Sequence, residues 1–222
     1  MTSLALKLIA ALLMLIDHIY WMIPNVPICF SWLGRLSAPV FFYLSVEGFF
    51  RTHSRKNYMI RLFAFGGLMV LLDYLLNIDN NIFLSLGCGI AMLSCLEKAK
   101  TSEKSLLYLL GAVAIAAASL FTEASVLGVG MMLIFYYFHE NKKTLCIIYV
   151  AFSFLLVLPY IGQTAFFNTV LNTDWQWMMA FAFPFFLAYN GEKGKGGAFA
   201  KWFFYIFYPL HLTLLWVIGM VL

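Results

Sequence analysis

The sequence predicts an all-α membrane protein, a polytopic helix bundle that forms a single domain over residues 1–222. Two observations lead to this fold class. Of the 222 residues, 64% are hydrophobic and only 11% are charged, whereas soluble domains carry about 25% charged residues. The apolar residues also gather in runs of roughly the length that crosses a bilayer core of about 30 Å. We count nine such segments, which leave no room for a soluble domain: residues 4–23, 28–50, 57–76, 81–96, 104–120, 123–138, 143–160, 175–190 and 200–222.

The first segment is expected to be a retained transmembrane helix rather than a signal peptide. Lys7 precedes an apolar core, but Asp17 and His18 interrupt that core and no small-residue cleavage pattern follows. Counted from Leu4 at the inner surface, His18 lies about 21 Å along the helix, in the outer half of the bilayer. Adjacent helical side chains diverge by about 100°, so we do not expect Asp17 and His18 to act as a dyad on one face.

Ionisable groups inside the apolar segments need partners, because each costs roughly 2.5–3.5 kcal/mol at the bilayer centre. Four formal charges fall there: Asp17, Arg35, Glu47 and Asp73. Arg35 enters early in the second segment at a depth comparable to that of Asp17, so the two can form an ion pair. Such a pair either organises an active centre or only fixes helix packing. His18 is a candidate general base, with an interhelical hydrogen bond as the alternative.

The second segment ends in the densest group of basic residues in the chain. Glu47 and Arg51 are spaced i,i+4 and can meet on one helix face. Arg51, His53, Arg55 and Arg61 follow one another closely, and such a cluster suits phosphate groups. The alternative is an ordinary cytoplasmic loop that contacts anionic lipid.

The distribution of Lys and Arg predicts a cytoplasmic N-terminus and an outer C-terminus. With this orientation every Lys and Arg except Arg35 lies at an inner helix end or in an inner loop, as the positive-inside rule requires. The net charge of +4 therefore reflects topology, and no nucleic-acid partner is expected. The four cysteines lack metal-ligand spacing, and we expect no metal site. Trp21, Trp32 and Trp175 fit an outer aromatic belt.

The middle segments leave the topology open, and the last segment contains a second candidate residue for the active centre. The short fourth segment and the tight turn at residues 121–124 also allow a re-entrant pair, and no internal repeat of the transporter kind is visible. In the last segment, Pro209 lies two residues before His211, and a proline within a helix leaves a backbone carbonyl without its usual partner. His211 is therefore a second candidate for the active centre, and a hydrogen bond that stabilises the kink is the alternative.

Several short motifs, taken in order, resemble the TraX family of membrane proteins. The resemblance spans nearly the whole chain, although the middle segments match only as hydrophobic spans, and Ser37-Ala38 replaces a bulkier apolar pair. The motifs are Met14-Leu15-Ile16-Asp17-His18, Gly34-Arg35-Leu36-Ser37-Ala38-Pro39-Val40-Phe41, Val46-Glu47-Gly48-Phe49, Tyr58-Met59-Ile60-Arg61-Leu62 and Tyr208-Pro209-Leu210-His211.

The resemblance implies an acetyltransferase in the inner membrane of a bacterium, because a member of the family acetylates the N-terminus of conjugative pilin. The acyl donor would be cytosolic acetyl-CoA, bound by its phosphates to Arg51, His53, Arg55 and Arg61. The acceptor would be an amine or hydroxyl of a membrane-inserted peptide or glycan. His18 would be the base and Asp17 its organiser. The remaining candidates would bind or position substrate: Arg35, Glu47, Asp73, Tyr208 and His211.

Other functions stay open at this point. A ping-pong reaction through an acetyl-histidine is an alternative to direct transfer. A proton-coupled transporter would use Asp17, Arg35, Glu47 and Asp73 as its relay. A membrane scaffold would use the same polar residues only for helix association.

Overall fold

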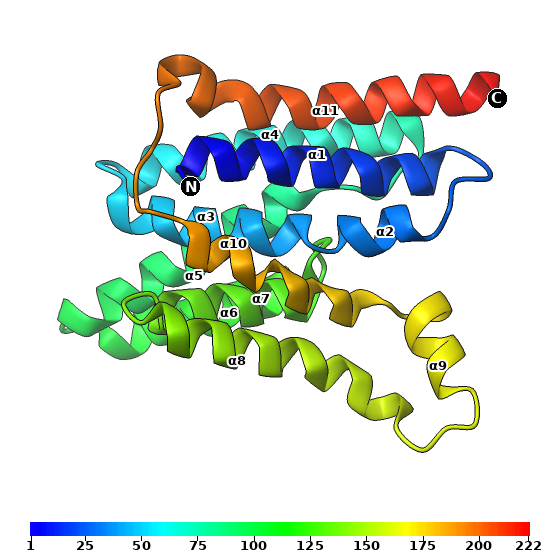
Figure 1. Ribbon diagram of the computed structural model, residues 1–222. Helices are drawn as coiled ribbons and strands as arrows, with labels where there is room; N and C mark the ends of the chain where they lie inside the picture. Colours follow the sequence, from blue (N-terminus) through cyan, green and yellow to red (C-terminus); the bar gives the residue numbers. More distant parts are fainter. The chain divides into compact units, whose positions relative to one another are not determined.

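The computed structural model describes residues 1–222, and all of its regular secondary structure is helical, without a β-strand (Figure 1). The predicted all-α class is therefore confirmed. The elements are α1 (Ser3–Met22), α2 (Cys29–Gly34), α3 (Ser37–Arg51), α4 (Arg55–Leu76), α5 (Ile82–Thr101), α6 (Ser105–Ser119), α7 (Ser125–Tyr137), α8 (Lys142–Phe154), η1 (Leu155–Tyr160), α9 (Phe166–Asn168), η2 (Thr169–Thr173), η3 (Gln176–Ala182), α10 (Phe183–Ala188) and α11 (Gly197–Val221).

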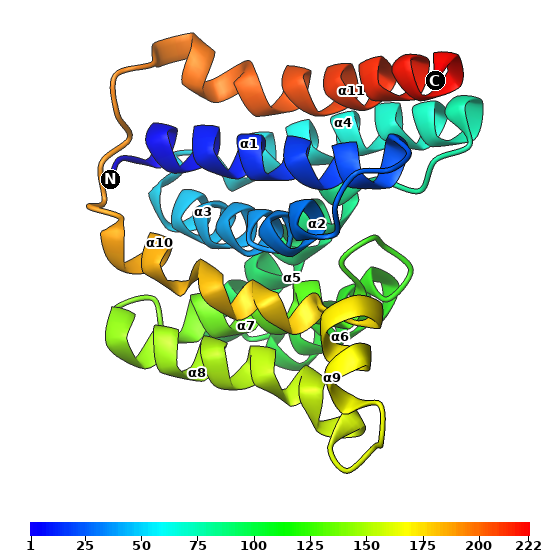
Figure 2. The same cartoon turned by 45° about the vertical axis from the view of Figure 1, so that its right-hand side comes forward.

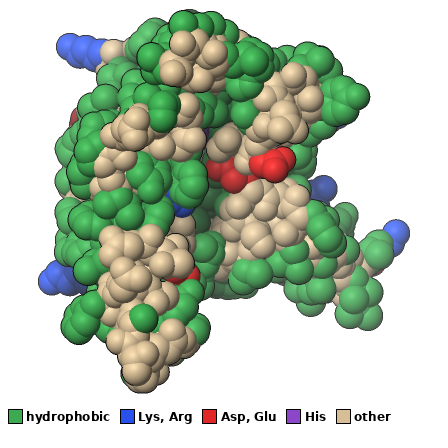
Figure 3. Space-filling model, turned by 90° about the vertical axis from the view of Figure 1, so that its right-hand side faces the viewer, with side chains coloured by type: hydrophobic (Ala, Val, Ile, Leu, Met, Phe, Trp, Pro, Cys, Tyr) green, Lys and Arg blue, Asp and Glu red, His purple; other side chains and the backbone are tan.

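Five helical stretches are long and apolar enough to cross a membrane: α1, α4, α5, α8 continued by η1, and α11. Much of the surface is made of hydrophobic side chains, and charged ones are few on the face shown in Figure 3. On α6, for example, Leu106 is 70% exposed and Val113 is 66% exposed, as side chains that contact lipid are. The chain is thus a multi-pass membrane protein, while the nine spans and their orientation stay predictions.

The chain divides into two compact units, which are described separately below. The first unit consists of Met1–Phe41 and Glu140–Leu222, and the second unit is Phe42–His139. In the second unit α5 packs against α4, α6 and α7. The assignment of residues 1–222 to a single domain stays a prediction.

In the first unit, α1 packs against α2 and α11, and Figures 1 and 2 both show α1 and α11 side by side. The two helices approach closely near the end of α11, where a Cβ added to Gly219 would lie 2.6 Å from the backbone oxygen of Met22. Small residues allow this kind of contact between membrane helices.

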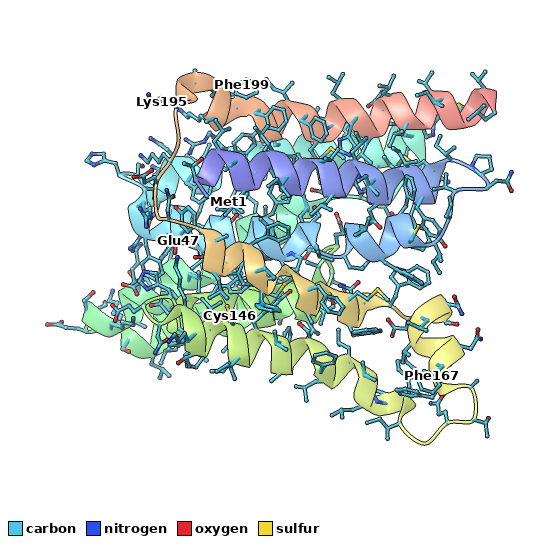
Figure 4. All side chains as sticks on the ribbon, in the orientation of Figure 1. Met1, Glu47, Cys146, Phe167, Lys195 and Phe199 are labelled. Carbon is cyan, nitrogen blue, oxygen red and sulfur yellow. The ribbon has the colours of Figure 1, made fainter.

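The other end of α1 is tied to the connection that leads into α11. The first backbone N–H groups of a helix have no partner within the helix. Here Ser3 donates to the carbonyl of Glu192 at 2.8 Å, and Leu4 donates to that of Lys193 at 3.1 Å. Figure 4 shows Lys195 on this connection at the same end of the unit as Met1. Hydrogen bonds at one end and close packing at the other thus fix how α1 lies along α11.

Three predicted segments are not continuous α-helices. One of them, at residues 143–160, passes from α8 into the 3₁₀ helix η1. The segment at residues 28–50 is broken between α2 and α3, because Pro39 has no N–H and its ring would clash with the carbonyl of Arg35 in an unbroken helix. Pro39 instead lies in the first turn of α3, where proline is tolerated. Arg35 therefore lies at a helix break and not within a helix as predicted. The segment at residues 175–190 is likewise divided, into the 3₁₀ helix η3 and the short α10.

Candidate active site

Two histidines face each other inside the first unit. Nδ1 of His18, on α1, lies 2.7 Å from Nε2 of His211, on α11. Their planes differ by only 9° and their ring centres are 4.9 Å apart. The side chains are almost inaccessible, since His18 is 5% exposed and His211 is 4% exposed. The structure therefore brings together two candidates that are 193 residues apart in the sequence.

Residues of α11 next to His211 contact this histidine pair. Nδ1 of His211 lies 2.8 Å from the carbonyl oxygen of Phe207, one turn earlier. The ring of Tyr208, which is 1% exposed, meets both imidazoles edge-on, at 6.1 Å from His18 and 5.7 Å from His211. The carbonyl of Pro209 accepts a hydrogen bond from the Thr213 hydroxyl at 2.8 Å. The interhelical hydrogen bond expected as the alternative role of His18 is thus present. That His211 stabilises a kink at Pro209 stays a prediction, because its bond is to the carbonyl of Phe207.

Asp17 belongs to a different network from its neighbour His18, as the 100° divergence predicted. Its carboxylate forms an ion pair with Nη2 of Arg35 at 3.1 Å and accepts a hydrogen bond from the Ser31 hydroxyl at 2.7 Å. The Asp17 side chain contacts the helix break so closely that a Cβ added to Gly34 would overlap it. Asp17 and Arg35 therefore hold α1 against the break between α2 and α3.

Arg35 and Ser31 extend this network to the segment around η3. Nη1 of Arg35 donates to Oε1 of Gln176 at 3.0 Å, and the indole N–H of Trp175 donates to the Ser31 hydroxyl at 3.1 Å. Trp175 is only 8% exposed, so it is not a lipid-facing belt residue as predicted. Nε of Arg35 is buried without a partner. Arg35 thus keeps one hydrogen-bond donor that no protein group satisfies.

Sequence reasoning missed Ser31, Trp175 and Gln176. Uncharged polar residues are common near membrane surfaces, so neither Ser31 nor Gln176 stands out as costly. Trp175 was placed at the interface by its position alone, and only the tertiary structure shows that it is buried. No local signal in the sequence distinguishes these three residues.

The remaining candidates lie in the second unit. Glu47 forms the predicted i,i+4 ion pair with Arg51, with Nε of Arg51 3.0 Å from Oε2 of Glu47. The guanidinium of Arg55 lies over the ring of Phe49, at 4.0 Å from its centre. Arg61, on α4, lies over the ring of Tyr58 at 5.8 Å. Arginines held in this way keep their charge, so the cluster remains suited to phosphate.

Two further candidates of the second unit differ in exposure. His53 is exposed in the short connection between α3 and α4. Asp73 lies near the end of α4, and its Oδ1 is buried without a hydrogen-bond partner. Across the chain, no group of three His, Cys, Asp or Glu residues lies close enough to hold a metal ion.

A network that the sequence did not suggest joins α5 and α7 in the second unit. Nζ of Lys100 lies 2.9 Å from Oε1 of Glu97 and 2.6 Å from the hydroxyl of Tyr136. Tyr136 in turn donates to Glu97. The ring of Phe50 packs parallel to that of Tyr136, with the ring centres 5.6 Å apart. Through Phe50 the network contacts the end of α3, next to Arg51, within the same unit.

Comparison with known proteins adds a family to this description. The model of a family described as TraX protein matches residues 3–219. The chain is also similar to the probable fimbrial assembly protein FimC, serogroup H1, of Dichelobacter nodosus. The two are 28% identical over 204 residues, which cover 84% of this chain and 81% of that protein. No solved structure matches the chain.

Proposed function

Because the chain belongs to the TraX family, we propose that it is an acetyltransferase of the bacterial inner membrane. It moves an acetyl group from cytosolic acetyl-CoA to an amine or hydroxyl acceptor at the outer side. The observation that carries this proposal is the buried contact between His18 and His211, because an imidazole is the usual general base in proteins. The similarity to a probable fimbrial assembly protein favours a membrane-inserted pilus subunit as the acceptor.

In the proposed reaction, His18 removes a proton from the acceptor while the acceptor atom bonds to the thioester carbonyl carbon. The tetrahedral intermediate then collapses, the carbon–sulfur bond breaks, and the CoA thiolate takes the proton from His18. Tyr208 contacts both imidazoles and holds them in place. Arg35, with the unpartnered Nε, offers a hydrogen-bond donor for the developing oxyanion or for the acceptor.

Asp17 has an organising role in this proposal. It is hydrogen-bonded to Ser31 and Arg35, so it orients the guanidinium rather than exchanging a proton with His18. Glu47 similarly orients Arg51, with which it is paired. For Asp73, whose Oδ1 is buried and unpartnered, a role in substrate binding remains part of the proposal.

A direct test follows the release of CoA by the purified protein in lipid nanodiscs. Acetyl-CoA is supplied with a peptide that has a free N-terminus, and separately with the same peptide after N-acetylation and with a serine-containing peptide blocked at both ends. We expect release of CoA that depends on either the peptide with the free N-terminus or the blocked serine-containing peptide. The acetylated form of that acceptor should be detected by mass spectrometry. An absence of acceptor-dependent release, together with solute flux in proteoliposomes, would favour the transporter instead.

The basic cluster supplies a separate prediction for binding of the donor. The double variant Arg51→Ala, Arg55→Ala should raise the Kd for CoA by about 10²- to 10⁴-fold, because each of the two charge-assisted hydrogen bonds to phosphate contributes about 1.5–3 kcal/mol. Titration calorimetry in nanodiscs measures this, and Lys143→Ala, in another inner loop, is the matched control. Equal Kd values for all three proteins would show that the cluster contacts lipid only.

A further inference from the structure

The hydrogen bonds around His211 determine which of its nitrogens carries the proton. The oxygen of Phe207 is a carbonyl and can only accept, so Nδ1 of His211, 2.8 Å away, must be the donor. In a neutral imidazole the other nitrogen is then an acceptor. Nε2 of His211 consequently accepts from Nδ1 of His18, at 2.7 Å. This leaves Nε2 of His18 without a proton and with its lone pair available.

The ring geometry supports a true hydrogen bond between the imidazoles. Each ring nitrogen lies about one bond length from its own ring centre. With 2.7 Å between the nitrogens and 4.9 Å between the ring centres, the two nitrogens must lie close to the line that joins the centres. Because the ring planes differ by only 9°, the rings lie edge to edge in one plane and are not stacked face to face. The N–H and the lone pair of an imidazole point in this plane, so the alignment is favourable.

Burial makes the neutral form of this pair the stable one. A doubly protonated His211 would reverse the bond and move the proton of His18 to Nε2, where it would block the lone pair. An imidazolium at this position would be a buried charge, which is costly without a charged partner. The α11 groups that contact the pair include the carbonyl of Phe207 and the rings of Phe207 and Tyr208, none of which carries a compensating negative charge.

We propose that His211 is a positioning residue that, anchored on the Phe207 carbonyl, holds His18 in the tautomer with a free Nε2. The inference rests on the proposed function and deepens it. In hydrolases with a nucleophile–histidine–carboxylate triad, a third group orients the base. Here a neutral imidazole takes that place. When His18 accepts the substrate proton at Nε2, its Nδ1–H bond to His211 is kept, and the proton then passes to the CoA thiolate.

Nitrogen NMR of histidine-labelled protein in nanodiscs tests this assignment, with His18→Gln identifying the resonances of His18. We expect His18 to be protonated at Nδ1 and unprotonated at Nε2 in the parent. In His211→Phe, which lacks the acceptor, the preference should be lost. In His211→Gln, whose side-chain oxygen can accept near the former Nε2, it should be kept. A parent spectrum with the proton on Nε2, or an unchanged tautomer in His211→Phe, overturns the proposal.

Kinetics provide the second readout. His211→Phe should lower kcat by about 10- to 100-fold with an unchanged KM for acetyl-CoA, while His211→Gln should recover most of the rate. If His211→Phe does not fold, the tautomer in the parent and in His211→Gln still decides the matter. Failure of the proposed function is distinguishable, because then no variant transfers acetyl groups while the tautomer of His18 still follows the residue at position 211. Equal kcat for parent and His211→Phe contradicts the positioning role.

Discussion

Replacement of His18 by alanine should lower kcat for acetyl transfer by about 10²- to 10⁴-fold, the range that a positioned general base contributes. The Kd for CoA should stay the same, because the basic cluster assigned to the donor belongs to the second unit and His18 to the first. The protein should remain folded, because leaving Nε2 of His211 without its donor costs about 1–3 kcal/mol, less than the stability of a typical protein. Steady-state release of CoA and calorimetric binding of CoA measure the two quantities.

The control for this prediction is His139→Ala, which removes a histidine that has no assigned role. His139 packs against Phe50, with the ring centres 4.0 Å apart, so its loss should affect packing only and leave kcat unchanged. Turnover in His18→Ala equal to that of the parent would remove His18 from the catalytic role. A residual rate with an accumulating acetylated protein in the parent would instead indicate the ping-pong route.

Replacement of Gly34 by alanine should cause the largest loss of stability among glycine-to-alanine changes in the first unit. The added methyl group would overlap the Cβ and the carboxylate of Asp17, and the carboxylate cannot move aside without breaking its bonds to Ser31 and Arg35. Overpacking of this kind costs about 1–3 kcal/mol. We therefore expect a clear decrease in the midpoint of thermal unfolding, followed by tryptophan fluorescence in detergent.

Gly67→Ala is the matched control for this stability prediction. Gly67 also lies in a helix, but an added Cβ meets nothing within 4 Å. Because alanine favours the helix over glycine by up to about 1 kcal/mol, this variant should be neutral or slightly more stable than the parent. If Gly34→Ala and Gly67→Ala unfold at the same temperature, the close contact between Asp17 and the helix break does not contribute to stability.

Hydropathy was sufficient to locate the long helices, because the bilayer allows few ways to satisfy backbone hydrogen bonds. The short α9 and η2 lie outside the nine segments. Each of the nine apolar segments contains helix in the structure. The break before Pro39 could have been inferred from the proline itself, since Arg35 is the residue whose carbonyl its ring displaces. The division of residues 175–190 has a weaker local signal, a proline at position 184 in the first turn of α10.

The free-energy cost of polar groups in lipid identified part of the candidate site, but it did not predict which of the site residues contact one another. It singled out four formal charges, while His18 was chosen as a candidate base and His211 for its place after Pro209. Nothing in either histidine's segment indicates that the two meet. Their contact depends on how α1 and α11 are aligned, which is set by Ser3 and Leu4 at one end and by Gly219 at the other. These are tertiary features without a periodic pattern. The partners Ser31 and Gln176 could not be predicted from the sequence for a related reason. An uncharged polar side chain near the membrane surface costs little free energy, so its presence does not indicate a functional site.

The alignment of α1 with α11 also has a consequence for biosynthesis. His18 and His211 are separated by 193 residues, and at about 5–20 residues per second their synthesis is separated by roughly 10–40 s. During that interval α1 is already in the membrane while the partner for Nδ1 of His18 does not yet exist. The proposed reactive centre is therefore complete only when α11 inserts, so in an incompletely translated or prematurely terminated chain Nδ1 of His18 lacks its partner His211.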